Sequence, residues 1–371
     1  MYITVLCKVV DNFGDIGVAW RLCRRLAKIQ KQYKICLVVD DFDSFAKIEP
    51  SVIASNPSVS VSNPSVLASN PSVIASEAKQ STVIKGIEIF KWQDDELCHK
   101  VFKENDGERL GIILELFQCG RPDWMEQILF EEKLEHTVQI IMIDYLTAEK
   151  YAEDFHCLQS LTRSAKVKKV NFMPGFTDKT GGLIIDEAWE QMPQWNKDGP
   201  VLEFTYKTKC AYLHSAESLR HSKGSKDPSK IKLSFMPQTD WDQMMRTCSA
   251  LIVRGEESMS RACLSGIPFI WQAYPQSEEY QLVKVKALLE RMRPHFSEEA
   301  FAIVEKAWMA INTTNSMSLR GANEVSDVAI YDFLNARSTL VPYFQDFAKS
   351  LQKNGDLCTN LMTFIQKLAI I

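Results

Sequence analysis

The chain has 371 residues and a mass of 42.3 kDa, with 46% hydrophobic and 24% charged residues, a composition typical of a globular protein with a sizeable core. This length favours two domains over one. The formal net charge of −4 argues against broad affinity for nucleic acid, and no apolar run approaches the roughly 18 residues of a membrane span.

The ten cysteines and six histidines show no pattern typical of a metal site. C-x-x-C and H-E-x-x-H motifs are absent, and Cys7, Cys36 and Cys263 lie inside apolar segments. We interpret the cysteines as small buried residues in a reducing compartment. The N-terminal apolar run has no basic segment before it and is needed as a strand, so we expect no signal peptide and a cytoplasmic protein.

The apolar run at residues 2–10 predicts a buried β-strand. The sequence D-N-F-G-D-I-G follows at residues 11–17, and apolar residues then recur at helical spacing from Ile16 to Ala27. A strand, a glycine turn and a helix form the opening of an α/β unit, in which ligands gather at the carboxyl ends of the strands.

Two carboxylates, Asp11 and Asp15, lie in this turn. An acidic turn suits a general base or a cationic partner better than a phosphate. Gly14 and Gly17 also fail to complete the G-x-G-x-x-G spacing of a dinucleotide site. The residue types leave a second interpretation open, in which Asp15 caps the helix and Asp11 ends the strand.

The first half of the chain alternates between strand and helix signals. Apolar runs predict strands at 35–39, 87–90, 112–116 and 138–143, and a helical pattern occupies 94–103. This alternation predicts a doubly wound parallel sheet. The loop at residues 41–43 formally matches a D-x-D metal motif, although acidic loops after strands are common.

Residues 50–82 interrupt this alternation with a repeat of period seven that begins at Pro50, Pro57, Pro64 and Pro71. A proline at every seventh position excludes a continuous helix, and the Asn-Pro junctions favour turns. We interpret the segment as a surface insertion without a chemical role, and pairing of its Ser-Val-Ile pieces as edge strands stays open.

The second half repeats the α/β pattern. Strand signals occur at 201–206, 231–235, 251–253 and 268–271, and the chain is mostly helical from residue 276. We therefore predict two Rossmann-like domains that face a central cleft. The expected domains are 1–155, which includes the 50–82 insertion, and 156–355, and the helix at 356–371 could pack back on the first domain.

A second polar constellation follows the strand at 249–253. The sequence R-G-E-E-S occupies 254–258 and leads into a helix, with Gly255 in the turn. Amides at the start of a helix bind anions, and Arg254 and Ser258 add a charge and a hydroxyl, so the segment suits a diphosphate. The alternative is an ordinary capped helix whose acids are solvated.

Other polar and aromatic residues follow neighbouring strands of the second half. Phe235 and Gln238 could read a nucleobase, and they could equally be a core phenylalanine and a turn glutamine. Tyr274 closes the next strand and is expected to face the same crevice.

Five stretches, taken in order, resemble one family. They are D-N-F-G-D-I-G-V-A-W-R-L at 11–22, P-G-F-T followed by T-G-G at 174–182, F-x-P-Q at 235–238, R-G-E-x-S at 254–258 and Y-P-Q at 274–276. The chain resembles the protein-arginine rhamnosyltransferases that modify translation elongation factor P. The resemblance extends from residue 1 to the C-terminal helices, apart from the 50–82 insertion.

The resemblance implies an α/β glycosyltransferase of the GT-B type that inverts the anomeric centre. It implies dTDP-β-L-rhamnose as donor, an arginine of elongation factor P as acceptor, and no cofactor, metal, nucleic acid or membrane partner. The catalytic residues it implies are Asp15, Asp11 and Glu256. The substrate-binding candidates are Asn12, Phe13, Gly14, Gly17, Phe176, Gly182, Tyr206, Phe235, Gln238, Arg254, Gly255, Glu257, Ser258 and Tyr274.

The chain departs from the family pattern at two positions. The acid after R-G-E is usually aspartate and is Glu257 here, and a usual histidine is replaced near Gln272, to which we assign no role.

Two alternatives from other functional classes remain open on the sequence. One is an NAD-dependent oxidoreductase with Asp40 as the ribose-binding acid, which the incomplete glycine spacing disfavours. The other is a non-catalytic α/β binding protein whose acidic turn docks a basic loop of a partner.

Overall fold

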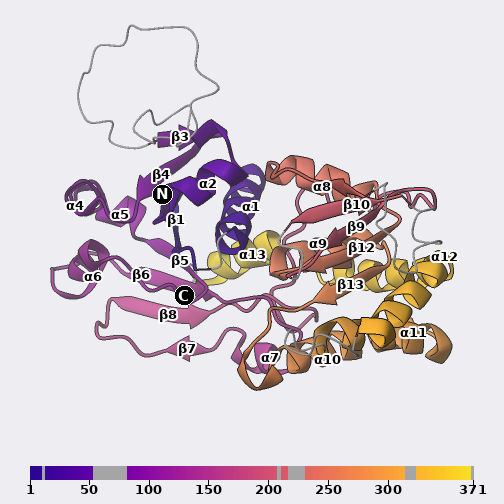
Figure 1. Ribbon diagram of the computed structural model, residues 1–371. Coiled ribbons are helices and arrows are strands. Elements are labelled where there is room, and N and C mark those ends of the chain that lie inside the picture. Colours follow the sequence, from indigo (N-terminus) through magenta and orange to yellow (C-terminus); the bar gives the residue numbers. More distant parts are fainter. Residues whose placement is uncertain (11–12, 53–81, 207–209, 216–229, 314–322, 369–371) are drawn as a thin grey trace, which may run out of the picture. The chain divides into compact units, whose positions relative to one another are not determined.

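The computed structural model describes residues 1–10, 13–52, 82–206, 210–215, 230–313 and 323–368 (Figure 1). The chain forms two compact units. Unit 1 contains Met1–Ile143 and Gln159–Asn171, and unit 2 contains Asp144–Leu158 and Phe172–Ile371. The chain therefore passes between the units three times, whereas the sequence predicts one boundary at residue 155 and leaves open a return of the helix at 356–371 to the first domain. Residues 53–81, which hold nearly all of the repeats, lie outside the described residues.

Unit 1 is built on an eight-stranded sheet with the order β3-β4-β2-β1-β5-β6-β8-β7. The six inner strands are parallel, and the short edge strands β3 and β7 pair antiparallel with β4 and β8. The strands are β1 (Tyr2–Cys7), β2 (Lys34–Val39), β3 (Thr82–Ile84), β4 (Ile87–Lys91), β5 (Ile112–Leu116), β6 (Val138–Ile143), β7 (Gln159–Ser160) and β8 (Val167–Asn171).

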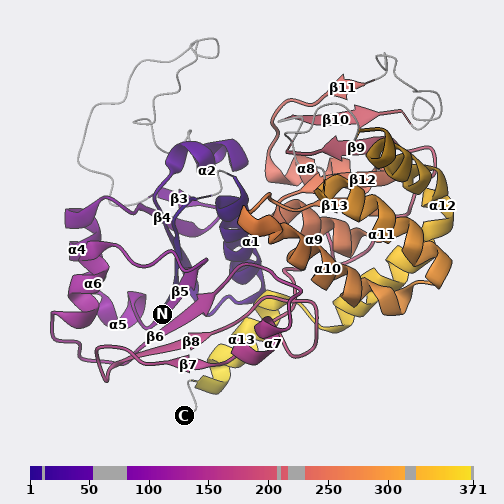
Figure 2. The same cartoon turned by 60° about the horizontal axis from the view of Figure 1, so that its bottom comes forward.

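Helices cover both faces of this sheet (Figures 1 and 2). The helices α1 and α2 pack together through Trp20 and Phe45, whose rings meet edge to face at 5.1 Å. On the other face, α4 and α6 cover a core that includes Phe102 and Trp124. The helices of unit 1 are α1 (Gly14–Ile29), α2 (Phe42–Ile48), α4 (Asp95–Glu104), α5 (Asp106–Arg109) and α6 (Asp123–Phe130). The predicted doubly wound α/β class is confirmed for this unit.

Strand β1 is shorter than the sequence predicts. The apolar run extends to Val10, but the strand ends at Cys7. Beyond that residue the amides of Val9 and Val10 donate to the side chains of Asp40 and Asp15. These carboxylates replace the strand partners, so the backbone turns away from the sheet.

Unit 2 contains a five-stranded sheet with the order β11-β10-β9-β12-β13. The strands β9, β12 and β13 are parallel, and β10 and β11 add an antiparallel edge, so this sheet is mixed where the sequence predicts parallel strands alone. The strands are β9 (Val201–Phe204), β10 (Ala211–His214), β11 (Ile231–Lys232), β12 (Ala250–Arg254) and β13 (Phe269–Gln272).

Helices form most of the remainder of unit 2. They are α7 (Tyr151–Phe155), α8 (Gln238–Arg246), α9 (Glu256–Ser265), α10 (Gln281–Met292), α11 (Glu298–Thr313), α12 (Asn323–Lys353) and α13 (Leu357–Leu368). Trp189, Trp308 and Phe344 are among the large side chains buried in the core. Full burial of an apolar side chain contributes about 1.5–3 kcal/mol to stability.

The last helix, α13, is anchored within unit 2. The Leu357 amide donates to the Leu183 carbonyl at 2.8 Å, and Asp356 accepts a hydrogen bond from the Ile185 amide at 2.8 Å. The Phe364 ring packs on Phe172 at 5.4 Å.

The glycine-rich loop at 174–182 approaches this anchor closely. Gly182 has a φ of +84°, and a Cβ atom there would lie 2.7 Å from the Gly355 carbonyl oxygen. The positive φ and the lack of space for a side chain therefore explain a glycine at position 182 without any contact to a substrate.

We expect Gly182→Ala to destabilise unit 2 by more than about 1 kcal/mol, because a left-handed residue gains a side chain that collides with fixed backbone. Thermal unfolding of the full chain measures this change. Gly255→Ala is the matched control, since Gly255 has a φ of +71° and no atom within 4 Å of an added Cβ. If both variants lose the same amount of stability, close packing at Gly182 is not the cause of the effect.

Candidate functional site

The turn after β1 is held by two carboxylates. The Val9 amide donates to Asp40 Oδ1 at 2.8 Å, and the Val10 amide donates to Asp15 Oδ2 at 2.8 Å. Asp15 is buried, with 3% of its surface exposed. The aspartate that the sequence proposes as a base therefore lies inside unit 1 with its carboxylate fixed against the backbone.

Asp15 is not the N-cap of α1. That position is Phe13, which makes no side-chain cap, and Asp15 lies in the first helical turn. The hydrogen bond from the Val10 amide to Asp15 joins the helix to the preceding strand end, so the capping interpretation of Asp15 is wrong. The Lys47 ammonium lies 5.3 Å from the centre of the Phe13 ring.

Several further site candidates belong to the same turn. Gly14 begins α1, and the Gly17 amide donates to the Phe13 carbonyl at 3.0 Å. Asp11 and Asn12 lie outside the described residues.

The turn lies at the point where the strand order of unit 1 reverses. Strand β1 has β2 on one side and β5 on the other, and the inner strands follow the order of a dinucleotide-type doubly wound sheet. In such sheets ligands bind beyond the carboxyl ends of the strands at this reversal. The position of Asp15 therefore agrees with a ligand site on general topological grounds.

An open cavity of about 350 Å³ lies at this edge of the sheet, beyond the ends of β1, β4 and β5. Its lining is mainly polar and contains charges of both signs. The lining residues are Lys8, Trp92, Gln93, Asp95, Cys119, Gly120, Arg121, Pro122 and Asp123.

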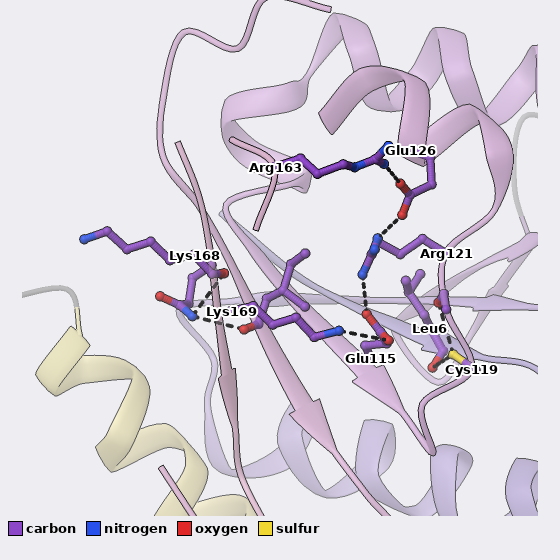
Figure 3. A network of polar contacts seen from close by, with 11 residues as sticks. Leu6, Glu115, Cys119, Arg121, Glu126, Arg163, Lys168 and Lys169 are labelled. Carbon is purple, nitrogen blue, oxygen red and sulfur yellow. Dashed lines mark hydrogen bonds and ion pairs between the residues drawn. The ribbon is translucent and has the colours of Figure 1, made fainter. Parts of the chain in front are cut away.

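A network of ion pairs supports one wall of this cavity (Figure 3). Arg121 Nη1 lies 2.5 Å from Glu115, whose side chain is 4% exposed, and Arg121 Nε lies 2.5 Å from Glu126. Lys169 approaches Glu115 at 3.5 Å, and Arg163 pairs with the second oxygen of Glu126. The network fixes the loop that leads from β5 to α6.

Cys119 in that loop is not a suitable nucleophile. Its sulfur contacts the Leu6 carbonyl at 3.5 Å. Burial, followed by the nearby Glu115 carboxylate, raises the pKa of the Cys119 thiol to about 12, so the reactive thiolate is scarce at neutral pH.

The D-x-D sequence at 41–43 has a structural explanation. Asp41 caps α2 and accepts hydrogen bonds from the Ser44 amide and hydroxyl at 2.9 and 2.6 Å. Burial opposes ionisation of Asp41, but the hydrogen bonds from Ser44 outweigh it and lower the pKa of the carboxyl. Across the described part of the chain, no cluster of three or more His, Cys, Asp or Glu side chains could hold a metal ion. None of the described helices is long and apolar enough to cross a membrane.

In unit 2, an aromatic and cationic cluster forms at the ends of the parallel strands. The Arg254 guanidinium lies over the rings of Phe204 and Tyr206, at 4.2 and 4.9 Å from their centres. Arg254 also donates to the Thr205 carbonyl at 3.0 Å. The Tyr206 ring meets Tyr274 edge to face at 5.3 Å, and Tyr274 is 60% exposed.

The start of α9 lies next to this cluster in the sequence, with Gly255 as its N-cap. Glu256 lies 4.0 Å from Lys284. Glu257 accepts a hydrogen bond from Gln238 at 3.4 Å and lies 3.9 Å from Arg261, which is buried. Glu257 thus contacts another candidate, Gln238.

The aromatic candidates differ sharply in exposure. Phe235 is 54% exposed, as a base-stacking ring must be, whereas Phe176 is 6% exposed and belongs to the core of unit 2. The Phe176 carbonyl accepts a hydrogen bond from Asn354 at 2.9 Å. Ser258 is also nearly buried, in the first turn of α9.

Sequence reasoning missed two members of the unit 2 cluster. Phe204 supports the Arg254 guanidinium, and Gln272 accepts a hydrogen bond from the Tyr206 amide at 2.8 Å. Arg254 and Gln272 are paired in the register of β12 and β13, and this pairing of two strand ends is the signal that could have identified Gln272.

Comparison with known proteins gives consistent matches over nearly the whole chain. The family model described as "Elongation-Factor P (EF-P) rhamnosyltransferase EarP" matches residues 3–222 and 201–366. A protein-arginine rhamnosyltransferase of Shewanella oneidensis is 27% identical, with 98% of this chain and 97% of that protein covered. The Pseudomonas aeruginosa protein of the same name is 26% identical, with 85% and 88% covered.

Two solved structures are also similar. One is described as "Structural basis for EarP-mediated arginine glycosylation of translation elongation factor EF-P"; it is 16% identical, covers 99% of both chains and has a TM-score of 0.40. The other, described as "Crystal Structure Analysis of the Glycotransferase of kitacinnamycin", is 9% identical, covers 98% of both chains and has a TM-score of 0.47.

The ion-pair network predicts unequal effects of two substitutions in unit 1. Glu115→Gln leaves Arg121 and Lys169 without a buried counter-charge, so we expect a loss on the order of 3 kcal/mol in the free energy of unfolding. Arg163→Ala removes a side chain that is 71% exposed and should cost less than about 1 kcal/mol. Urea denaturation measures both, and a larger loss for Arg163→Ala would refute this ranking.

Proposed function

Because the chain belongs to the family of elongation factor P rhamnosyltransferases, we propose that it transfers rhamnose from dTDP-β-L-rhamnose to an arginine of elongation factor P. Membership of this family makes the protein a glycosyltransferase and sets aside the oxidoreductase and the non-catalytic binding protein. The family match supports the proposal most strongly, because it includes both the β1 turn and the segment at 254–258. The proposed acceptor acts in translation, so we also propose that the reaction occurs in the cytoplasm.

The acceptor chemistry explains why a fixed carboxylate is needed. A guanidinium has a pKa above about 12, so no carboxylate removes its proton in the ground state. The nitrogen loses basicity as it bonds to carbon, and a positioned carboxylate can then accept the proton. Asp15 suits this role because it is buried and held by the Val10 amide.

We propose Asp11 as the residue that orients the guanidinium, although the roles of the two aspartates could be exchanged. A carboxylate can bind the planar guanidinium through two hydrogen bonds and so localise the lone pair on the attacking nitrogen.

The proposed reaction is a single displacement. An arginine nitrogen bonds to C1 of rhamnose while the bond from C1 to the diphosphate oxygen breaks, and the proton from nitrogen passes to Asp15. Attack from the opposite side converts the β-linked donor into an α-linked product. We expect no metal in this step, because the amides at the start of α9 and the Arg254 guanidinium can stabilise the charge that develops on dTDP.

The unit 2 cluster suits the donor nucleotide. Exposed Phe235 and Tyr274 offer faces for the thymine ring. Gly255 leaves open space at the helix start, which lets a diphosphate approach the α9 amides. Glu256, the third catalytic candidate, begins that helix, and we propose that it contacts the sugar or the acceptor.

Asp15→Asn tests the proposed base. Asparagine retains an oxygen that can accept from the Val10 amide, but it cannot accept a proton. We expect turnover to fall by about 10²–10⁴-fold, while affinity for dTDP stays nearly unchanged. The mass shift of elongation factor P on rhamnose transfer measures turnover. Calorimetry measures the affinity for dTDP.

Asp41→Asn is the matched control for this experiment. Asp41 is another carboxylate near a strand end of unit 1, it caps α2, and asparagine caps helices equally well. We expect near wild-type transfer. Near wild-type transfer by Asp15→Asn as well would exclude Asp15 as the base.

Arg254→Ala tests the donor site. Loss of a charged hydrogen-bond donor should weaken dTDP binding by about 1–3 kcal/mol, as measured by calorimetry. Arg293→Ala is the control, because Arg293 also lies over a ring, that of Phe301 at 3.9 Å, but between α10 and α11. If a folded Arg254→Ala protein binds dTDP with unchanged affinity, the nucleotide does not bind at this cluster.

A further inference from the structure

The Gln272 side chain makes a hydrogen bond that spans one strand of the unit 2 sheet. Gln272 ends β13, and its Oε1 accepts a hydrogen bond from the Tyr206 amide at 2.8 Å. Tyr206 follows β9, and β12 lies between these two strands. The bond therefore joins segments 66 positions apart in the chain and passes the end of β12, where Arg254 lies.

The backbone at Gln272 is itself firmly held. The buried Asn312 side chain of α11 donates to the Trp271 carbonyl at 2.8 Å and accepts from the Ala273 amide at 2.9 Å. Both neighbours of Gln272 are thus fixed by one side chain. Further along, the Gln276 amide donates to the Gln281 side chain at 3.0 Å, which restrains the segment that contains Tyr274.

The amide that Gln272 binds belongs to the residue at the centre of the aromatic cluster. The Tyr206 ring contacts the Tyr274 ring on one side and lies under the Arg254 guanidinium. Because Tyr206 lies beyond the last residue of β9, the strand ladder does not fix its backbone. Gln272 and the bond from Arg254 to the Thr205 carbonyl hold this short segment in place.

We infer that Gln272 is a positioning residue for donor recognition, one that sets the Tyr206 ring against Arg254 and Tyr274 through a bond to the Tyr206 backbone. This inference rests on the proposed function, because it takes the unit 2 cluster as the nucleotide site. Gln272 acts through Tyr206 and needs no contact with the ligand.

Gln272→Met tests the inference, because methionine has a similar length but cannot accept the hydrogen bond. We expect about a 5-fold loss of dTDP affinity by calorimetry, the effect of one neutral hydrogen bond. In the transfer reaction, the KM for dTDP-rhamnose should rise while kcat changes little. The control is Gln243→Met on the exposed face of α8, which should leave affinity and KM unchanged.

A double-mutant cycle distinguishes positioning from a general structural effect. Tyr206→Ala removes the ring but keeps the amide, so Gln272→Met should cause no further loss of dTDP affinity in that background. In protein labelled with ¹⁵N-tyrosine, the Tyr206 amide should exchange with solvent faster in Gln272→Met than in wild type. The melting temperature reports whether the variants are folded.

The outcomes separate this inference from the proposed function. Wild-type protein that binds no dTDP overturns the proposed function before any variant is compared. If wild type binds dTDP, losses that add in the double mutant, or unchanged affinity and amide exchange in Gln272→Met, overturn the positioning role alone.

Discussion

A backbone group that lies beyond the last pair of a β-ladder needs a new hydrogen-bond partner, and both candidate sites are built around this constraint. In unit 1, Asp40 and Asp15 bind the amides of Val9 and Val10. In unit 2, Gln272 binds the Tyr206 amide, and Arg254 donates to the Thr205 carbonyl. The polar side chains at the strand ends thus fix the local backbone as well as offering groups to a ligand. Removing one of them would alter the shape of a site and its chemistry together.

The double role is clearest for Asp15. A buried carboxylate normally needs hydrogen-bond donors, and the Val10 amide supplies one of them to Asp15. A guanidinium is planar, weakly hydrated and rich in donors, so it is well suited to such a carboxylate. Burial also keeps the base in one orientation, which favours proton transfer at the moment when the new bond forms.

The sequence predicted strands such as β5 and β6 well because they are mostly apolar runs bounded by turns. Strands β5 and β6 have the predicted bounds, 112–116 and 138–143.

Prediction failed where distant side chains determine the course of the backbone. Strand β1 ends before Val9 because Asp40, 31 positions away, binds the Val9 amide. Strand β10 was missed because A-Y-L-H is only four residues long. The role of Gln272 depends on a partner 66 positions away, so no local pattern could reveal it.

The two adjacent acids at the start of α9 raise the question of how that helix could accept a diphosphate. A negative charge within the first turn competes with an anion for the helix amides. Glu256 lies 4.0 Å from Lys284, and Glu257 lies 3.9 Å from Arg261, so each carboxylate has a cation of its own nearby. Arg261 is buried and also donates to the Ile184 carbonyl at 2.7 Å, which holds its charge in place. With both acids near cations on the same unit, the positive potential at the helix start remains available to a ligand. The Glu257 carboxylate thus contacts both Gln238, another candidate residue, and Arg261.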